Sequence, residues 1–245
     1  MKTLNQKNIL KAAICVFLLG GLIASCSKGK SDPVAVDLTT VTATADNDLK
    51  SGGVYKGTLI GSTGSIKIVI QGDSKAAYLI FDGVTKTLET SDLGSWNSGQ
   101  AINNASFTSG DWRIVFSVNA NGSNPRLVVT IPGHNVSVAI VKEATTSLTR
   151  AYEGTFTVGN LTSTFNFVSK GDTAVTGVIR TTDALTVPLR GSIVGGRVTV
   201  SADSGTGYII GSGTITGTTA SGTFTETGYS SSYTVSGTWT AKKTL

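Results

Sequence analysis

From Val54 onward, hydrophobic and polar residues alternate along the chain with a period of two. In residues 233–241, one set of alternate positions holds Tyr, Val, Gly, Trp and Ala, while the other holds only Ser and Thr. The same alternation occurs in residues 112–118, 152–158 and 197–202. Successive side chains of a strand point to opposite faces, so this period is typical of strands with one buried face. The pattern predicts β-strands over these four ranges.

Short turn motifs separate the alternating segments. They are Gly72-Asp73, Asp82-Gly83, Asn121-Gly122, Pro132-Gly133, Gly171-Asp172 and Gly195-Gly196. Turns at such short intervals favour antiparallel hairpins, because a parallel connection needs a long crossover. Helix-forming stretches are nearly absent from this region. We therefore predict an all-β fold in which antiparallel meanders form small barrels or sandwiches.

Several short motifs recur at a nearly constant distance. The segment Tyr55-Lys-Gly-Thr-Leu59 is similar to Tyr152-Glu-Gly-Thr-Phe156, and Gly72-Asp73 recurs as Gly171-Asp172. Val136-Ser137 likewise recurs as Val235-Ser236. A constant offset indicates duplication, although such matches also arise by chance in Gly- and Thr-rich sequence. We predict two related halves, residues 54–146 and 147–245, as either two domains or one fused β-structure.

The Gly-Thr-aromatic strands carry a resemblance to a known group of folds. The last strand, with Ser236-Gly-Thr-Trp-Thr240, is similar to strands of the calycin group, the lipocalin-like and avidin-like up-and-down barrels. The resemblance implies a barrel fold. It covers only strand style and the closing Gly-Thr-Trp, so it assigns no ligand-binding residue to this chain.

The first residues have the three-part layout of an export signal. Lys2, Lys7 and Lys11 give a basic start, and an apolar run without acidic residues follows from Ala12 to Ala24. This run is shorter than the roughly 20 residues that a membrane-spanning helix needs. We predict that residues 1–25 are a signal peptide.

The end of the apolar run resembles the lipobox of bacterial lipoproteins. In Ile23-Ala24-Ser25-Cys26, an aliphatic residue and small residues precede a cysteine. The resemblance implies cleavage between Ser25 and Cys26, a diacylglycerol thioether on Cys26 and acylation of the new amino group, and two or three chains anchor a protein stably. The alternative is an ordinary secretory signal with a chance cysteine. We expect residues 26–53 to be the lipidated cysteine and a flexible tether rich in Ser, Thr, Asp, Lys and Gly.

Removal of the signal changes both the charge and the thiol content. The chain has 20 basic and 15 acidic residues, and cleavage leaves 17 basic residues and a formal net charge of +2. We see no basic cluster, so the sequence does not indicate nucleic-acid binding. Cys15 lies in the signal and Cys26 carries lipid, which leaves the folded region without a thiol. Disulfides, thiolate catalysis and cysteine-ligated zinc are thereby excluded.

Candidate catalytic groups are few. His134, the one histidine, lies between Pro-Gly and Asn in a predicted turn, whereas a catalytic base is buried and oriented by a carboxylate. Glu153 is the acid best placed on a strand, but its alternation with Tyr152 and Phe156 predicts a solvated side chain. We expect no catalytic residue, no metal site and no cofactor.

A polar run of 21 residues between predicted strands, residues 91–111, contains Trp96 and Phe107. Long loops without regular structure are often functional. Exposed at a surface, these two side chains would contact a ligand or a partner, as a stacking platform for a sugar ring or an anchor in a pocket. Alternatively they fold back and cover an open end of the barrel. We expect Trp112 and Trp239 to be core residues.

Together these features predict a lipid-anchored envelope protein. Its β-domain would be non-catalytic and would bind a partner protein, a glycan or a small apolar ligand. The alternatives are a carbohydrate-active hydrolase with paired carboxylates and a purely structural or adhesive surface protein.

The residues after Cys26 bear on localisation. By resemblance to the enterobacterial sorting pattern, Ser27 favours the outer membrane. In Bacteroidota an acidic cluster directs surface display, whereas residues 27–32 here are basic, so we expect the periplasmic face. Asp172-Thr173-Ala174 resembles the O-glycosylation sequon of the same bacteria.

Overall fold

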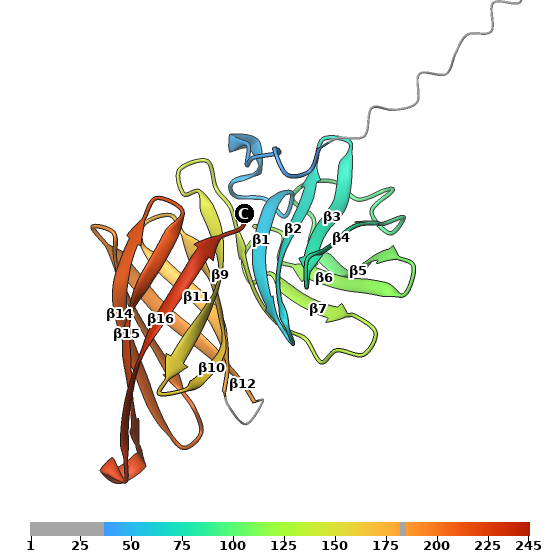
Figure 1. The fold of residues 1–245 in the computed structure, drawn as a ribbon. Helices are drawn as coiled ribbons and strands as arrows, with labels where there is room; N and C mark the ends of the chain where they lie inside the picture. The colour runs from blue at the N-terminus through green and yellow to red at the C-terminus, as the bar shows by residue number, and fades with distance from the viewer. Residues whose placement is uncertain (1–36, 182–184) are drawn as a thin grey trace, which may run out of the picture. The chain divides into compact units, whose positions relative to one another are not determined.

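The computed structural model describes residues 37–245 except 182–184, and Figure 1 shows their fold. These residues form sixteen β-strands and two single-turn 3-10 helices, η1 (Ala45–Asn47) and η2 (Tyr229–Ser231). Every strand pairs antiparallel with its neighbours, in two eight-stranded sheets. The all-β prediction is confirmed. The predicted signal peptide and the lipobox lie outside the described residues. Within the described part of the chain, no helix is long and apolar enough to span a membrane.

The first sheet contains strands β1 to β8 in the order β7-β6-β5-β4-β3-β2-β1-β8. Its strands are β1 (Gly53–Ile60), β2 (Thr63–Gln71), β3 (Ser74–Phe81), β4 (Val84–Glu89), β5 (Ile102–Ser109), β6 (Trp112–Val118), β7 (Arg126–Thr130) and β8 (Ser137–Lys142). The last strand pairs with β1 and not with β7, so no ladder joins the two edge strands β7 and β8 among the described residues. The sheet is therefore barrel-like but not closed.

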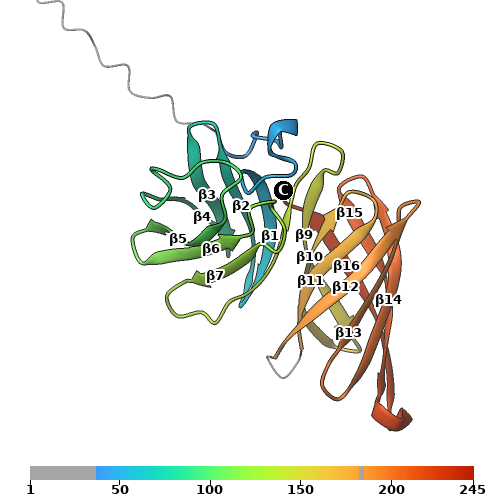
Figure 2. The same ribbon diagram turned by 180° about the vertical axis from the view of Figure 1, so that it is seen from behind.

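The second sheet contains strands β9 to β16 and is a closed barrel, because β16 pairs with β9. Its strands are β9 (Thr149–Val158), β10 (Leu161–Lys170), β11 (Ala174–Arg180), β12 (Thr186–Val194), β13 (Arg197–Asp203), β14 (Gly207–Thr216), β15 (Thr219–Gly228) and β16 (Thr234–Lys243). Figure 2 shows the wall formed by β12, β13 and β14. Consecutive strands are neighbours throughout, as expected for a meander.

The six predicted turn motifs all lie in turns of the structure. In the hairpin between β12 and β13, Gly195 and Gly196 have φ values of 56° and 78°. Two successive residues with positive φ are the geometry of a tight hairpin turn that matches strand twist, and glycine adopts it without steric cost.

The motifs that recur at a constant offset occupy equivalent places in the two sheets. Tyr55 lies in β1 and Tyr152 in β9, each in the first strand of its sheet, and both side chains are fully buried. Gly72-Asp73 and Gly171-Asp172 both form the turn between the second and third strands. The third pair lies where the eighth strand of each sheet begins. The two halves therefore have the same strand order and differ in closure.

Each sheet encloses its own hydrophobic core. In the first, Tyr55 packs against Phe116 with ring centroids 4.8 Å apart. In the second, Tyr152 stacks on Phe167 at 4.7 Å, and Trp239 lies at right angles to Phe167 at 6.4 Å. The expectation that Trp239 belongs to the core is confirmed, whereas Trp112 is half-buried at the edge of the first core.

The prediction of a flexible tether is wrong for residues 37–53. Leu38 is only 6% exposed. The buried ammonium of Lys67 donates to the carbonyl oxygen of Thr39 at 2.8 Å, and Lys142 donates to the carbonyl oxygens of Asn47, Lys50 and Gly52. Two buried cations thus hold the backbone of this segment, which composition alone does not indicate because the partners are far away in sequence.

Glu143 links this N-terminal segment to both sheets. Its fully buried carboxylate forms an ion pair with Lys56 of β1 at 2.6 Å. It also accepts hydrogen bonds from the backbone N–H of Ala43 and of Thr149, where β9 begins. A buried carboxylate needs such partners to offset its desolvation. Residues 37–245 belong to one compact unit that starts at Val36. A shortened protein of residues 36–245 therefore includes every contact described here and is suitable for experiments in solution.

In strand β10, residues 165–169 are buried on both faces. Its inward side chains Phe165 and Phe167 belong to the barrel core, while Asn166, on the opposite face, is fully buried against β1. The amide of Asn166 donates to the carbonyl oxygen of Leu59 at 2.8 Å and accepts from the N–H of Gly154 at 3.1 Å. A polar residue is tolerated there because its hydrogen bonds are satisfied.

The buried lysines predict a rise of stability with pH. Burial lowers the pKa of Lys67 to about 8, below its ordinary value of 10.5. The unfolded chain therefore binds more protons above pH 8, and the free energy of unfolding rises with pH until the unfolded lysine titrates. Lys142 shifts in the same direction. We expect urea unfolding of residues 36–245 between pH 8 and 9.5 to show a positive slope, approaching about 1.4 kcal/mol per pH unit for each such lysine.

Replacement of Lys67 by methionine should remove the part of this slope that Lys67 contributes. Lys170→Met, at an exposed position of β10, should keep the full slope. A slope that is the same in K67M and in the wild type would contradict the assignment. The window ends near pH 9.5 because burial raises the pKa of Tyr55, so ionisation of the unfolded tyrosine opposes folding at higher pH.

Candidate functional site

The interior of the closed barrel contains the candidate site. Alternation along β14, β15 and β16 places Gly213, Gly222 and Trp239 toward the inside, with Gly213 opposite Gly222 and Gly222 opposite Trp239 in the ladders. A Cβ atom on Gly213 would overlap the indole of Trp239 and the carbonyl oxygen of Ser221. Gly213 therefore leaves space that the large ring fills, while a Cβ atom on Gly222 would overlap the backbone of β14 at Ser212. The close approach of these strands explains why they combine glycine with an aromatic residue.

The aromatic side chains around Trp239 close the barrel at one end. Phe165 lies against Trp239 with ring centroids 5.3 Å apart, and Phe167 and Tyr152 lie behind them. Trp239 is only 3% exposed, and its Nε1 donates to the carbonyl oxygen of Thr223 at 3.3 Å. Trp239 and Phe165 form the floor of a pocket that fills the other end of the barrel.

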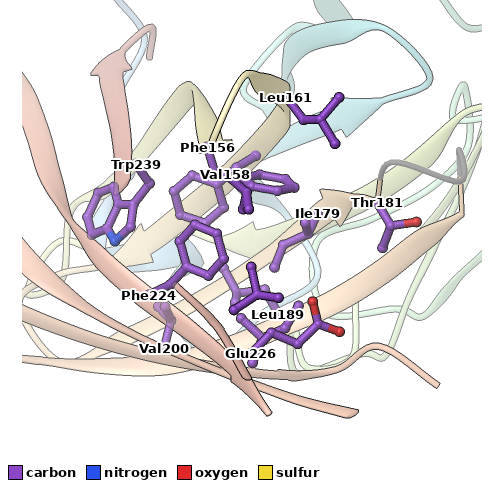
Figure 3. A pocket seen from close by; sticks show the side chains of 13 residues that line it. Phe156, Val158, Leu161, Ile179, Thr181, Leu189, Val200, Phe224, Glu226 and Trp239 are labelled. Carbon is purple, nitrogen blue, oxygen red and sulfur yellow. The ribbon is translucent and has the colours of Figure 1, made fainter. Parts of the chain in front are cut away.

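This pocket has a volume of about 240 Å³. Its lining side chains, shown in Figure 3, are almost all aliphatic or aromatic: Phe156, Val158, Leu161, Phe165, Ile179, Thr181, Leu189, Val200, Ile209, Phe224, Glu226, Val235 and Trp239. Phe156 and Phe224 meet edge to face at 5.4 Å. An apolar cavity of about 150 Å³ already accommodates benzene, so this pocket is large enough for a ligand with one aromatic ring.

The polar groups of the pocket lie at its outer end. In Figure 3, the Glu226 carboxylate and the Thr181 hydroxyl lie on the side away from Trp239. Oε1 of Glu226 accepts hydrogen bonds from the hydroxyls of Ser204 at 2.7 Å and Tyr233 at 2.9 Å. The connections β13–β14 and β15–β16 therefore hold the carboxylate in position. A pocket that only had to enclose apolar groups would not need an oriented carboxylate.

A second carboxylate, that of Asp203, lies outside the pocket lining. It accepts hydrogen bonds from the Tyr229 hydroxyl at 2.5 Å and from the N–H of Gly205 at 2.9 Å. The hydrogen bond from Tyr229 lowers the pKa of Asp203 and raises that of Tyr229 to about 12. Both groups are exposed, and their bond positions η2 beside the barrel end.

The predicted contact residues Trp96 and Phe107 do not form this site. Phe107 is fully buried in the core of the first sheet, so its prediction as a ligand or partner contact is wrong. Residues 102–109 of the expected loop form β5, and alternation within that strand turns Phe107 inward. Trp96 is half-buried against the same core, and its Nε1 donates to the carbonyl oxygen of Gln100. Both side chains therefore pack on the core of the first sheet, and neither lies in the pocket of the closed barrel.

The other residues considered in the sequence analysis lie away from the pocket or outside the described residues. Ser25 and Cys26 lie outside the described residues. His134 is exposed in the turn after β7, with its ring edge-to-face on Phe81 at 4.9 Å. Glu153, expected in solvent, is half-buried and accepts a hydrogen bond from Thr63 at 2.9 Å, because β1 and β2 pack beside β9. In the part of the chain that the structure describes, no three His, Cys, Asp or Glu residues gather as metal ligands.

Glu226 is not among the site residues predicted from the sequence, although the sequence contains a signal for it. In β15 the inward positions include Ala220, Gly222 and Phe224, and Glu226 follows on the same alternate set. An acid on the apolar face of an alternating segment contradicts the strand pattern, and such contradictions often mark functional positions.

Fold and site together define a β-barrel protein with an apolar interior pocket that has one carboxylate at its open end. Comparisons with known proteins give no match: no family model, no curated protein and no solved structure is similar to the chain. Its function is therefore inferred from the geometry of the site.

Proposed function

We propose that the protein is an envelope lipoprotein, anchored through lipid on Cys26 at the periplasmic face of the outer membrane. We further propose that its closed barrel, β9 to β16, binds a small, mainly apolar molecule without transforming it. The observation that carries this proposal is the pocket of about 240 Å³ inside the closed barrel. Concave apolar pockets with few polar groups are typical ligand sites.

The lining of the pocket favours binding over hydrolysis. Paired-acid hydrolysis needs two carboxyl groups that face one substrate. Among the lining residues, Glu226 is the one acid, and no histidine, lysine or cysteine accompanies it there. The same pocket favours this proposal over a purely adhesive β-protein, which needs no internal cavity.

Binding can be tested by filling the pocket. Isothermal calorimetry on residues 36–245 should detect 4-phenyl-1-butanol, a neutral probe with one ring. Val200→Phe and Val235→Trp add volume at two lining positions, and both should weaken binding at least about tenfold, because the added ring takes the ligand's space. Val194→Phe is the matched control, since Val194 is 76% exposed.

The filled variants must retain their fold, which circular dichroism and urea unfolding check. Val235 lies near the open end of the barrel and tolerates a larger side chain better than the buried Val200. Unchanged affinity in a folded V235W variant would contradict binding in this pocket.

A further inference from the structure

The carboxylate of Glu226 has one oxygen in use and one available. The hydroxyls of Ser204 and Tyr233 both donate to Oε1. No hydrogen bond to Oε2 is present among the described residues. The two donors fix the orientation of the carboxylate, which lies at the polar end of the pocket (Figure 3).

No basic side chain of the pocket lining faces this carboxylate. The lining includes no lysine, arginine or histidine. Arg180 precedes the lining residue Thr181, but its guanidinium donates to the carbonyl oxygen of Gly61 at 2.7 Å, toward the first sheet. A carboxylate partly withdrawn from water favours a cationic partner.

We propose that the ligand is a cationic amine with a small apolar body, and that Oε2 of Glu226 binds its ammonium group. This inference rests on the proposed function and identifies the chemical class of its ligand. The apolar body lies among Phe156, Phe224 and Trp239, while the ammonium group lies at the polar end. An ammonium donates charge-assisted hydrogen bonds, which are stronger than those of a neutral hydroxyl, and a carboxylate ligand is repelled.

Three probes of matched length test the charge preference. Isothermal calorimetry on residues 36–245 compares 4-phenylbutylamine, 4-phenyl-1-butanol and 4-phenylbutyrate at pH 7. We expect the amine to bind about tenfold more tightly than the alcohol, and the carboxylate most weakly. In Glu226→Gln, whose side chain has the same shape without the charge, the amine should lose this advantage, while the affinity for the alcohol should stay within about twofold.

Asp203→Asn is the matched control, because Asp203 is an acid at the same barrel end that does not line the pocket. This variant should keep the preference for the amine. Equal affinities of amine and alcohol in the wild type, or an unchanged preference in E226Q, would overturn the inference while leaving the proposed function supported by alcohol binding. If none of the three probes binds, the proposed function itself fails.

Discussion

Replacement of Cys26 by serine is expected to release the protein from the membrane almost completely. In our proposal, which rests on the resemblance to a lipobox, Cys26 is the site of diacylglycerol attachment, and serine lacks the sulfur on which the thioether forms. Several acyl chains give stable membrane attachment, so their loss should exceed any effect of a surface substitution. We expect C26S to lose metabolic labelling by an alkyne analogue of palmitate, whereas wild type is labelled and sediments with outer membranes.

Cys15→Ser provides the matched control for this experiment. Cys15 lies within the apolar run that the signal peptidase removes in our proposal, so its replacement should leave labelling and sedimentation unchanged. Labelling that persists in C26S, or disappears in C15S, would contradict attachment at Cys26. Protease treatment of intact cells tests the side of the membrane, and cleavage there would overturn the periplasmic assignment.

Replacement of Gly213 by valine is expected to destabilise the closed barrel by about 3 kcal/mol or more. A side chain at this position would overlap the Trp239 ring and the backbone of β15. Overpacking a core typically costs about 1–3 kcal/mol, and the cost is higher where backbone blocks relaxation. Because Trp239 also forms the pocket floor, we expect G213V to lose ligand binding as well.

Urea unfolding followed by circular dichroism measures this effect on residues 36–245. Gly94→Ala is the control, since a Cβ there meets no atom closer than 3.6 Å, and its effect should stay within about 0.5 kcal/mol. A free energy of unfolding for G213V close to that of G94A would contradict the role of Gly213 in accommodating Trp239. The double variant Gly213→Val with Trp239→Leu should recover part of the loss, because the smaller side chain removes one of the two overlaps.

The all-β class, the turns and the equivalence of the two halves follow from local sequence. The alternation of side chains and the positive-φ turns depend only on residues that are close together in the sequence. The predicted segments 112–118 and 197–202 therefore coincide with β6 and β13 to within a residue. The inward direction of Trp239 follows from the same alternation. The resemblance to a lipobox is equally local, and the proposed lipidation of Cys26 rests on sequence alone.

Only the tertiary structure decided which barrel closes and where a ligand fits. Barrel closure depends on pairing between β9 and β16, which are far apart in sequence. Lys67 and Lys142 bind the backbone of residues that we expected to form a flexible tether. Glu153 is half-buried because β1 and β2 pack beside β9. Glu226 became a site residue because two hydroxyls from separate turns orient it at the pocket. The strand pattern places an acid on the apolar face of β15, but it does not show which groups orient that acid. Barrel closure and the burial of Lys67, Lys142 and Glu153 depend on contacts between distant segments, which a local pattern does not specify.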